Sequence, residues 1–341
     1  KENINNKNNI RILLKNIVES SLGSLKQNLE QAYHSEAELN GFHPINEIKG
    51  IDAIKQMLWE PLLTSFPDLE RRDNLIIGGS FQDKIFVSCI SHLTGTFTKP
   101  WLNIPATNKT IHLRLCEVHQ LKDNKIIKSY VLIDVMDFIR QAGFWPINPS
   151  FGIEEMWPGP IIGNGSSFEN LDIKLSQESL SQGLTMQRSL NIKPESEEGI
   201  TNQEIRNKLI DHPQKDFWHK KMMWYGPCGI GTARGLEGFV DHHQLPFRLT
   251  FKERNYWEIG HYVELGDGPY SMTGGWHSIT ATHGSKDWLG YEPTQKQITM
   301  RVMDFYLHDE GLIRENWVPI DIVHILKQLD IDVFKLVEKM Q

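Results

Sequence analysis

Hydrophobic positions follow a helical period first and an alternating strand period afterwards, and this succession occurs twice along the chain. Apolar residues at helical spacing predict a first helix around residues 22–33 and a second over 51–58, with a less regular counterpart of the first around 205–218. Each series of strands is followed by a helix, at 135–142 and at 322–329. The alternating segments that predict strands are 84–92, 111–120, 126–133, 270–280, 298–307 and 312–320. Helices followed by an antiparallel sheet are typical of the α+β class.

The two halves also match residue by residue. Over the strands and the closing helix the matching residues lie 187 positions apart, and further upstream Gly41 and Gly226 lie 185 apart. The pairs at the longer offset include Trp101 and Trp288, Arg114 and Arg301, Asp134 and Asp321, and Gln141 and Gln328. A register kept over about forty residues predicts two copies of one domain.

The join between the copies lies in a polar segment. Pro158-Gly159-Pro160 breaks regular structure, and Ser, Glu and Gln dominate from there to residue 200. We therefore expect a first domain at residues 10–157, a linker at 158–200 that crosses the surface, and a second domain at 201–341. Leu171, Ile173 and Leu175 alternate, which predicts a short edge strand inside this linker.

Composition narrows the class of partner. The net charge is −7, and no run of five or six basic residues occurs, which argues against nucleic acid or an anionic membrane as the main partner. No apolar stretch approaches 18 residues, and three unevenly spaced cysteines cannot form a disulfide framework, so we expect a cytoplasmic protein. Ten Trp and 14 His, concentrated in the second half, are compatible with a small-molecule cavity and equally with ordinary core.

Two segments carry a family resemblance. Residues 101–109 and 288–296, with the motifs Trp101-Leu102-Asn103-Ile104-Pro105-Ala106-Thr107 and Trp288-Leu289-Gly290-Tyr291-Glu292-Pro293-Thr294, resemble the strand entry of SnoaL-like polyketide cyclases. This family belongs to the nuclear transport factor 2-like superfamily. The resemblance implies two tandem conical barrels, each a curved antiparallel sheet wrapped by N-terminal helices around a cavity. It also implies ring-closing aldol chemistry that uses one Asp as acid and base, without metal or organic cofactor.

Asp321 is the residue that we expect to perform this chemistry. It stands where the last strand meets the last helix and shares a face with Trp317 by strand alternation. A carboxyl group among aromatic side chains has a raised pKa and can remove a proton next to a carbonyl group. An Asp at a helix start also serves as an N-cap or in an ion pair, and both roles remain open.

Several other residues complete the predicted site. His283 matches a Thr-His pair of the family and is expected to be catalytic, with Asp134 as the equivalent of Asp321 in the first copy. Arg301 either clamps a substrate oxygen or forms a structural ion pair. The expected substrate-binding residues are Trp224, Tyr225, Trp276, His277, Arg301 and Trp317. The first copy has Phe97 in place of the histidine, so we expect the main site in the second copy.

Other motifs favour no metal or nucleotide site. The neighbours His242 and His243 diverge on a helix and cannot share one ion. The Gly-rich segment 226–232 lacks the ending of a phosphate loop and contains Pro227. Cys228 has no base partner in the sequence pattern. We therefore expect neither metal nor cofactor.

The function that these observations favour is a cofactor-independent enzyme for a small, partly apolar carbonyl compound. Aldol chemistry, isomerisation, dehydration and ester cleavage all remain open. The alternatives are a non-catalytic protein that binds a hydrophobic small molecule and an assembly protein whose tandem domains serve to dimerise. We expect the two repeats to pair within the chain, and a homodimer is possible.

Overall fold

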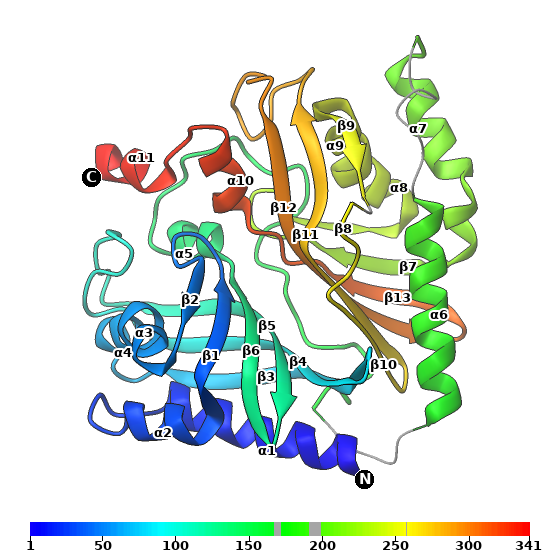
Figure 1. Cartoon of the computed structure of the whole chain (residues 1–341). Helices are drawn as coiled ribbons and strands as arrows, with labels where there is room; N and C mark the ends of the chain where they lie inside the picture. Colours follow the sequence, from blue (N-terminus) through cyan, green and yellow to red (C-terminus); the bar gives the residue numbers. More distant parts are fainter. Residues whose placement is uncertain (167–171, 191–198, 257) are drawn as a thin grey trace. The chain divides into compact units, whose positions relative to one another are not determined.

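The computed structural model describes residues 1–166, 172–190, 199–256 and 258–341. These residues form two compact units, each with one sheet and its own helices (Figure 1). Unit 1 comprises Lys1–Pro146, Pro158–Asn170 and Asp332–Gln341, and unit 2 comprises Ile147–Trp157 and Leu171–Ile331. The predicted tandem of α+β domains is confirmed.

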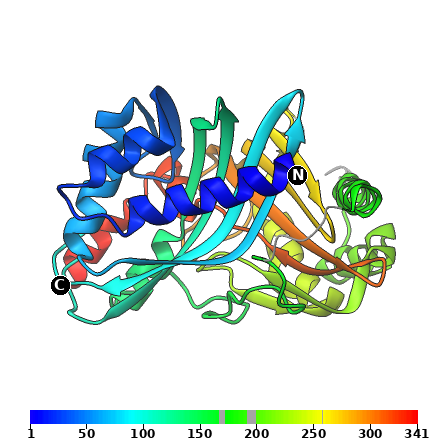
Figure 2. The ribbon, with the colours of Figure 1, turned by 90° about the horizontal axis from the view of Figure 1, so that it is seen from below.

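Unit 1 contains a six-stranded sheet in the order β2-β1-β6-β5-β4-β3. Its strands are β1 (Tyr33–Gly41), β2 (Glu47–Lys49), β3 (Glu70–Phe81), β4 (Lys84–Thr96), β5 (Thr110–Lys122) and β6 (Lys125–Ile133). Its helices are α1 (Glu2–Val18), α2 (Leu25–Ala32), α3 (Ile51–Ile54), η1 (Lys55–Trp59), α4 (Glu60–Ser65), α5 (Val135–Gln141) and α11 (Val333–Met340). Helix α1 runs across the long strands β3 and β4 (Figure 2).

Unit 2 repeats this plan with the strand order β10-β11-β12-β13-β7-β8, and β9 pairs with β11. Its strands are β7 (Trp218–Tyr225), β8 (Thr232–Arg234), β9 (Phe251–Asn255), β10 (Val263–Asp267), β11 (Tyr270–His283), β12 (Gln297–Asp309) and β13 (Leu312–Trp317). Its helices are α6 (Ile173–Ser189), α7 (Asn202–Asp211), η3 (Pro213–Asp216), α8 (Gly235–Phe239), η4 (Val240–Gln244), α9 (Leu245–Thr250) and α10 (Ile322–Gln328).

The strands and closing helices predicted from the sequence are confirmed. Most of the strands extend beyond their predicted bounds, whereas β13 ends three residues earlier and each closing helix one residue earlier. The turn between β5 and β6 has positive φ at Asp123 and Asn124, and the turn between β12 and β13 has positive φ at Glu310 and Gly311. Two consecutive residues in the left-handed region form the tight hairpin turn that matches the twist of antiparallel strands. These local turns make the strand register predictable.

Each sheet is mixed rather than purely antiparallel. Strand β1 pairs with β6 in parallel, and β7 pairs with β13 in parallel. Tyr33 and Trp218, which the hydrophobic period assigns to helices, instead begin β1 and β7. Aromatic residues favour strands, and pairing with a strand about a hundred residues further along the chain explains why these segments are strands. Helix α1 was not expected because its sequence is mostly polar, although Ile10, Leu14 and Ile17 are buried.

The edge strand predicted in the linker is wrong for the described residues. Ile173 and Leu175 begin helix α6, where the Asp172 side chain accepts a hydrogen bond from the Leu175 backbone amide as an N-cap. Leu171 lies outside the described residues. The helix turns small residues, Ser176 and Ser179 among them, toward the second sheet, while both apolar residues stay exposed. The packing of these small residues against the sheet therefore favours a helix, although the apolar residues alternate as in a strand.

The end of the first copy contributes to unit 2. Ile153 forms a β-bridge with Thr232, and the backbone amide of Asn148 donates to the carbonyl of Leu289 at 3.0 Å. A Cβ atom on Gly152 would lie 2.7 Å from the backbone of Gly231, so this contact requires glycine. Residues 147–157 are thus an integral part of the second unit.

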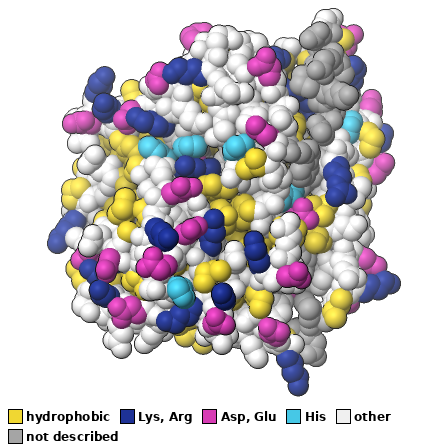
Figure 3. Space-filling model, in the orientation of Figure 1, with side chains coloured by type: hydrophobic (Ala, Val, Ile, Leu, Met, Phe, Trp, Pro, Cys, Tyr) yellow, Lys and Arg dark blue, Asp and Glu magenta, His cyan; other side chains and the backbone are white. Residues whose placement is uncertain are grey.

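The surface and the helices agree with the composition. Acidic and basic side chains are interspersed on the face shown in Figure 3, in keeping with the small net negative charge. Among the described segments, no helix combines the length and the apolar character needed to cross a membrane.

Candidate functional site

Unit 2 contains a cavity of about 170 Å³ between its helices and the concave side of its sheet. Apolar walls come from β7, α8 and β12, with Trp224, Phe239 and Val302 among them. Polar groups reach the cavity from β12 and β13 and from the loop before β10. These polar lining residues include Asp304, Tyr306, Asn316, His261 and Tyr256. A mainly apolar cavity with a few polar groups is the common form of a small-molecule site.

Asp304 is the acidic group of this cavity. It lies on β12 opposite Thr273 of β11, in a strand segment of mostly apolar residues. Burial raises the pKa of Asp304 to about 6, while the side chains of His261, Tyr306 and Asn316 lower it only partly. Among the described residues, no Lys or Arg forms an ion pair with this carboxyl group. A carboxyl group with this pKa can both accept and return a proton near neutral pH.

Helix α6 supplies a fixed hydrogen-bond donor beside this carboxyl group. The Gln187 side-chain amide donates to the hydroxyl oxygens of Thr273 and Tyr306, each at 2.8 Å. Burial and the nearby Asp304 raise the pKa of Tyr306, so its phenol stays protonated. Asn316 is held by a bond from its side-chain amide to the carbonyl of Phe305 at 3.0 Å. Helix α6, which lies in the segment predicted to be a linker, therefore takes part in building the cavity.

In the first copy, the repeat position of Asp304 has a different residue and different partners. Glu117 stands 187 residues before Asp304 and is fully buried. Its Oε2 lies 2.7 Å from Nη1 of Arg71, whose side chain is also fully buried, and His119 lies 3.6 Å away. Burial opposes the charged form of Glu117, but Arg71 and His119 together outweigh burial and hold the pKa at about 2. In the second copy, Tyr256 stands at the repeat position of Arg71 and lines the cavity.

Asp321 lies at the junction of sheet and closing helix. Its Oδ1 accepts a hydrogen bond from the His324 backbone amide at 3.1 Å and caps α10, and its Oδ2 lies 3.1 Å from Nη1 of Arg301. Gln328 of the same helix donates to the Thr299 carbonyl and accepts from the Thr299 amide, both at 2.9 Å. Asp321 is buried but is not among the residues that line the cavity.

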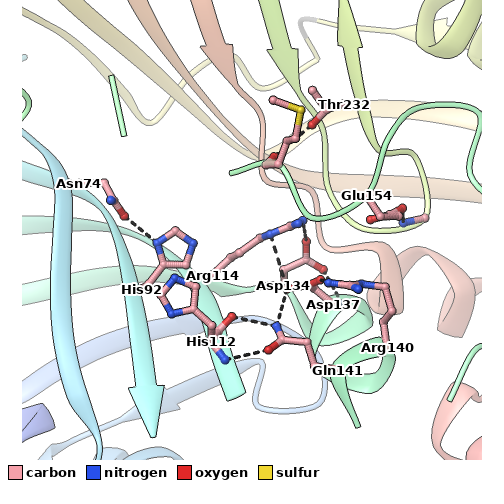
Figure 4. Close-up of polar contacts among 12 residues, drawn as sticks. Asn74, His92, His112, Arg114, Asp134, Asp137, Arg140, Gln141, Glu154 and Thr232 are labelled. Atoms are coloured by element: carbon pink, nitrogen blue, oxygen red, sulfur yellow. Dashed lines mark hydrogen bonds and ion pairs between the residues drawn. The ribbon is translucent and has the colours of Figure 1, made fainter. Parts of the chain in front are cut away.

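The first copy repeats this junction, as Figure 4 shows. Asp134 caps α5 by accepting from the Asp137 amide at 3.1 Å, and it lies 3.2 Å from Arg114. Gln141 clamps the backbone of His112 with bonds of 2.8 and 2.9 Å. The residues that recur in both copies therefore join the closing helix to the sheet.

The remaining predicted residues are dispersed. Trp224 lines the cavity, whereas Tyr225 and Trp317 stack on each other in the core, and the Tyr225 hydroxyl donates to Glu315 at 2.7 Å. His283 is buried against the loop that follows β11, with ring contacts to Thr294 and the Lys286 carbonyl.

Trp276 and His277 lie outside the cavity lining. The Arg301 guanidinium lies 5.2 Å from the centre of the Trp276 ring, and His277 lies 3.3 Å from Glu258. Asp304, Tyr256 and Gln187 were not predicted as site residues, although the repeat contained a signal. An ion pair of the first copy, Arg71 with Glu117, has become a Tyr and an Asp in the second.

The fold and the cavity define a tandem protein of the nuclear transport factor 2-like class. The family profile described as SnoaL-like polyketide cyclase matches residues 22–142 and 202–329, which is more than half of the chain. The chain therefore belongs to the SnoaL-like polyketide cyclase family and contains two tandem copies of its domain. A comparison with curated proteins gave no match.

Solved structures of single domains resemble parts of this chain. A protein from Jannaschia sp. CCS1, provisionally described as a SnoaL-like polyketide cyclase, is 15% identical over 39% of this chain and 90% of its own, with a TM-score of 0.33. TsrD from Streptomyces laurentii is 15% identical over 40% of this chain and 96% of its own, with a TM-score of 0.34. IdmH from Streptomyces antibioticus, provisionally described as a polyketide cyclase, is 13% identical over 39% and 98%, with a TM-score of 0.33. Similarities at this level say nothing about activity.

The junction geometry predicts a structural cost in each copy, smaller in the first, where Asp137 lies 3.5 Å from Arg114 as a second carboxylate partner. Asp321→Ala and Asp134→Ala each remove a helix cap and one partner of a largely buried ion pair. We expect each to lower the free energy of unfolding by about 2–4 kcal/mol, measured by urea denaturation. Asp321→Asn keeps a capping oxygen and should cost less. A stable Asp321→Ala protein that has lost activity would instead indicate a direct chemical role.

The buried pair of unit 1 predicts a pH dependence of stability. The folded-state pKa of Glu117 is about 2, below its ordinary value of 4.5, so its contribution to stability is complete above about pH 4.5 and is lost as the pH falls toward 2. Between pH 6 and pH 3, we expect wild type to lose about 2 kcal/mol more stability than Glu117→Gln in urea denaturation. Equal losses in the two proteins would show that Glu117 is not charged and paired.

Proposed function

We propose that unit 2 is a cofactor-independent enzyme for a small, partly apolar carbonyl compound, with Asp304 as its acid and base. The observation that carries this proposal is a carboxyl group with a pKa raised to about 6 inside a mainly apolar cavity. Membership in the SnoaL-like polyketide cyclase family supports an enzymatic role of the cyclase or isomerase type. The hydrogen-bond donors that line the cavity also support this proposal.

The proposed reaction begins with proton removal. The Asp304 carboxylate takes a proton from the carbon next to the substrate carbonyl, and the electron pair moves to the carbonyl oxygen as an enolate. Tyr256 in the cavity wall is a hydrogen-bond donor that would stabilise the oxygen charge, while the Tyr306 hydroxyl bonds to Asp304 itself. The enolate then attacks a second carbonyl carbon or is reprotonated at another carbon. Asp304 returns the proton to the resulting alkoxide or carbon, which completes an aldol addition or an isomerisation.

Asp321 and Arg301 have a positioning role in this proposal. The Asp321 amide donates to the Arg301 carbonyl at 3.1 Å, and the next residues, Ile320 and Val302, form a β-bridge. Both of these bridge residues line the cavity. The pair therefore shapes the wall that faces the substrate, while Asp304 performs the proton transfer.

Unit 1 is a scaffold in this proposal. Its Glu117 is already neutralised by Arg71 and has a low pKa, so it is a poor base near pH 7. Asp134 is used as a helix cap and in an ion pair, as Asp321 is. The proton transfer is thus confined to the copy that lacks the arginine.

Exchange of α-protons tests the proposed base directly. Small cyclic ketones, 2-tetralone first, are incubated in D2O with wild type, Asp304→Asn or the matched first-copy variant Glu117→Gln, and exchange is followed by proton NMR. We expect Asp304→Asn to lower the enzyme-catalysed rate about 10²–10⁴-fold and Glu117→Gln to leave it unchanged. The wild-type rate should rise with pH through about 6 and level off above it.

Two outcomes would contradict this proposal. Unchanged exchange in Asp304→Asn would exclude this carboxyl group as the base. Ketones that bind wild type without any accelerated exchange would favour the alternative of a non-catalytic binding protein.

A further inference from the structure

A second, larger cavity lies beside the first in unit 2. Its volume is about 300 Å³, and its walls come from residues 148–151, from η4 and α9, and from the loop 286–290. Aromatic and aliphatic side chains dominate these walls, with Phe151, Phe247, Trp288 and Leu289 among them. Residues 148–151, which belong to unit 2 although they precede the second repeat, supply one wall of this cavity.

His243 separates the two cavities. It lines both of them, together with Phe247. Its ring stacks on Trp224 with centroids 4.1 Å apart, and Phe247 lies 5.8 Å away on the same row of rings. In the part of the chain that the structure describes, no protein group forms a hydrogen bond with this imidazole.

In the first copy, the positions that correspond to His243 and Phe247 are occupied by residues that serve only to pack the core. Leu58 and Leu62 stand 185 residues before His243 and Phe247, and both leucines are buried in an apolar core. His243 itself is half-buried, and an imidazole without a protein hydrogen bond packs less favourably there than a leucine. The replacement is explained if a bound molecule supplies the missing partner.

Phe151 points to the same conclusion independently. It is 66% exposed, although its segment is held by a bond from the Gly152 amide to the Ile230 carbonyl at 3.1 Å and by the bridge at Ile153. Phe151 therefore places an accessible apolar ring at the wall of this cavity, where a bound molecule can pack against it.

We propose that the outer cavity is a second binding site, for an uncharged planar ring compound that bears a hydroxyl or carbonyl group. The aromatic walls bury the ring, and His243 holds the polar group. Burial, aided by Arg248, lowers the pKa of His243 to about 3, so its neutral ring offers one donor and one acceptor. Lys286 and Asp287 lie side by side at this cavity with opposite charges, which favours a ligand without net charge.

Binding of 2-naphthol tests this proposal, with isothermal titration calorimetry on the full chain as the measurement. We expect saturable binding to wild type. His243→Leu, which copies the first repeat, and Phe151→Ala, a change at an exposed residue, should each raise the dissociation constant at least about tenfold, as the loss of roughly 1.4 kcal/mol implies. Both variants should fold, which circular dichroism checks.

The inner cavity provides the matched control. Asp304→Asn changes only that cavity and should leave the affinity for 2-naphthol within about twofold. Binding that is lost in Asp304→Asn but kept in Phe151→Ala would place the probe in the inner cavity and overturn this proposal. Absence of saturable binding to wild type would also overturn it. Neither result bears on the proton-transfer role of Asp304, which the exchange assay tests separately.

Discussion

A carboxyl group surrounded by apolar side chains must either have a cationic partner or hold its proton more tightly, and the two halves of this chain satisfy this constraint in opposite ways. In unit 1, Arg71 lies 2.7 Å from Glu117 and stabilises the charged form. In unit 2, Asp304 has no such partner among the described residues, and its pKa rises to about 6. The same position of one fold is therefore a charged member of an ion pair in one copy and a carboxyl group with a raised pKa in the other.

Residues that are identical in the two copies have a different role from residues that differ between them. The recurring pairs Arg114–Asp134 and Arg301–Asp321 cap the closing helices and anchor them to the sheets. The differing positions line the cavities of unit 2, where His243 takes the place of a leucine and Tyr256 that of an arginine. Residues kept between repeats thus hold the closing helix to the sheet, whereas the proposed function depends on residues that changed. The family membership is compatible with this division, because the fold alone does not fix the chemistry.

The sequence was sufficient for the tandem repeat, the long strands and the closing helices, because alternation, tight turns and the 187-residue register are local or repeated signals. It was insufficient for β1 and β7, which are strands because β6 and β13 pair with them over a long distance. Asp321 could be placed at a helix start from the sequence, but its pairing with Arg301 depends on how the closing helix packs. The site around Asp304 depends on Gln187 from the apparent linker, which no local pattern connects to β12.

The pKa of Asp304 itself tests the central claim most directly. Carbon-13 NMR of carboxyl-labelled aspartate, with Asp304→Asn used to assign the signal, gives this value without a known substrate. The structure predicts a titration near pH 6, and replacement of Tyr256 by Arg should lower it by restoring the charge pattern of the first copy. A titration at or below the ordinary aspartate range near 4 in the wild type would contradict the assignment of Asp304 as the acid and base.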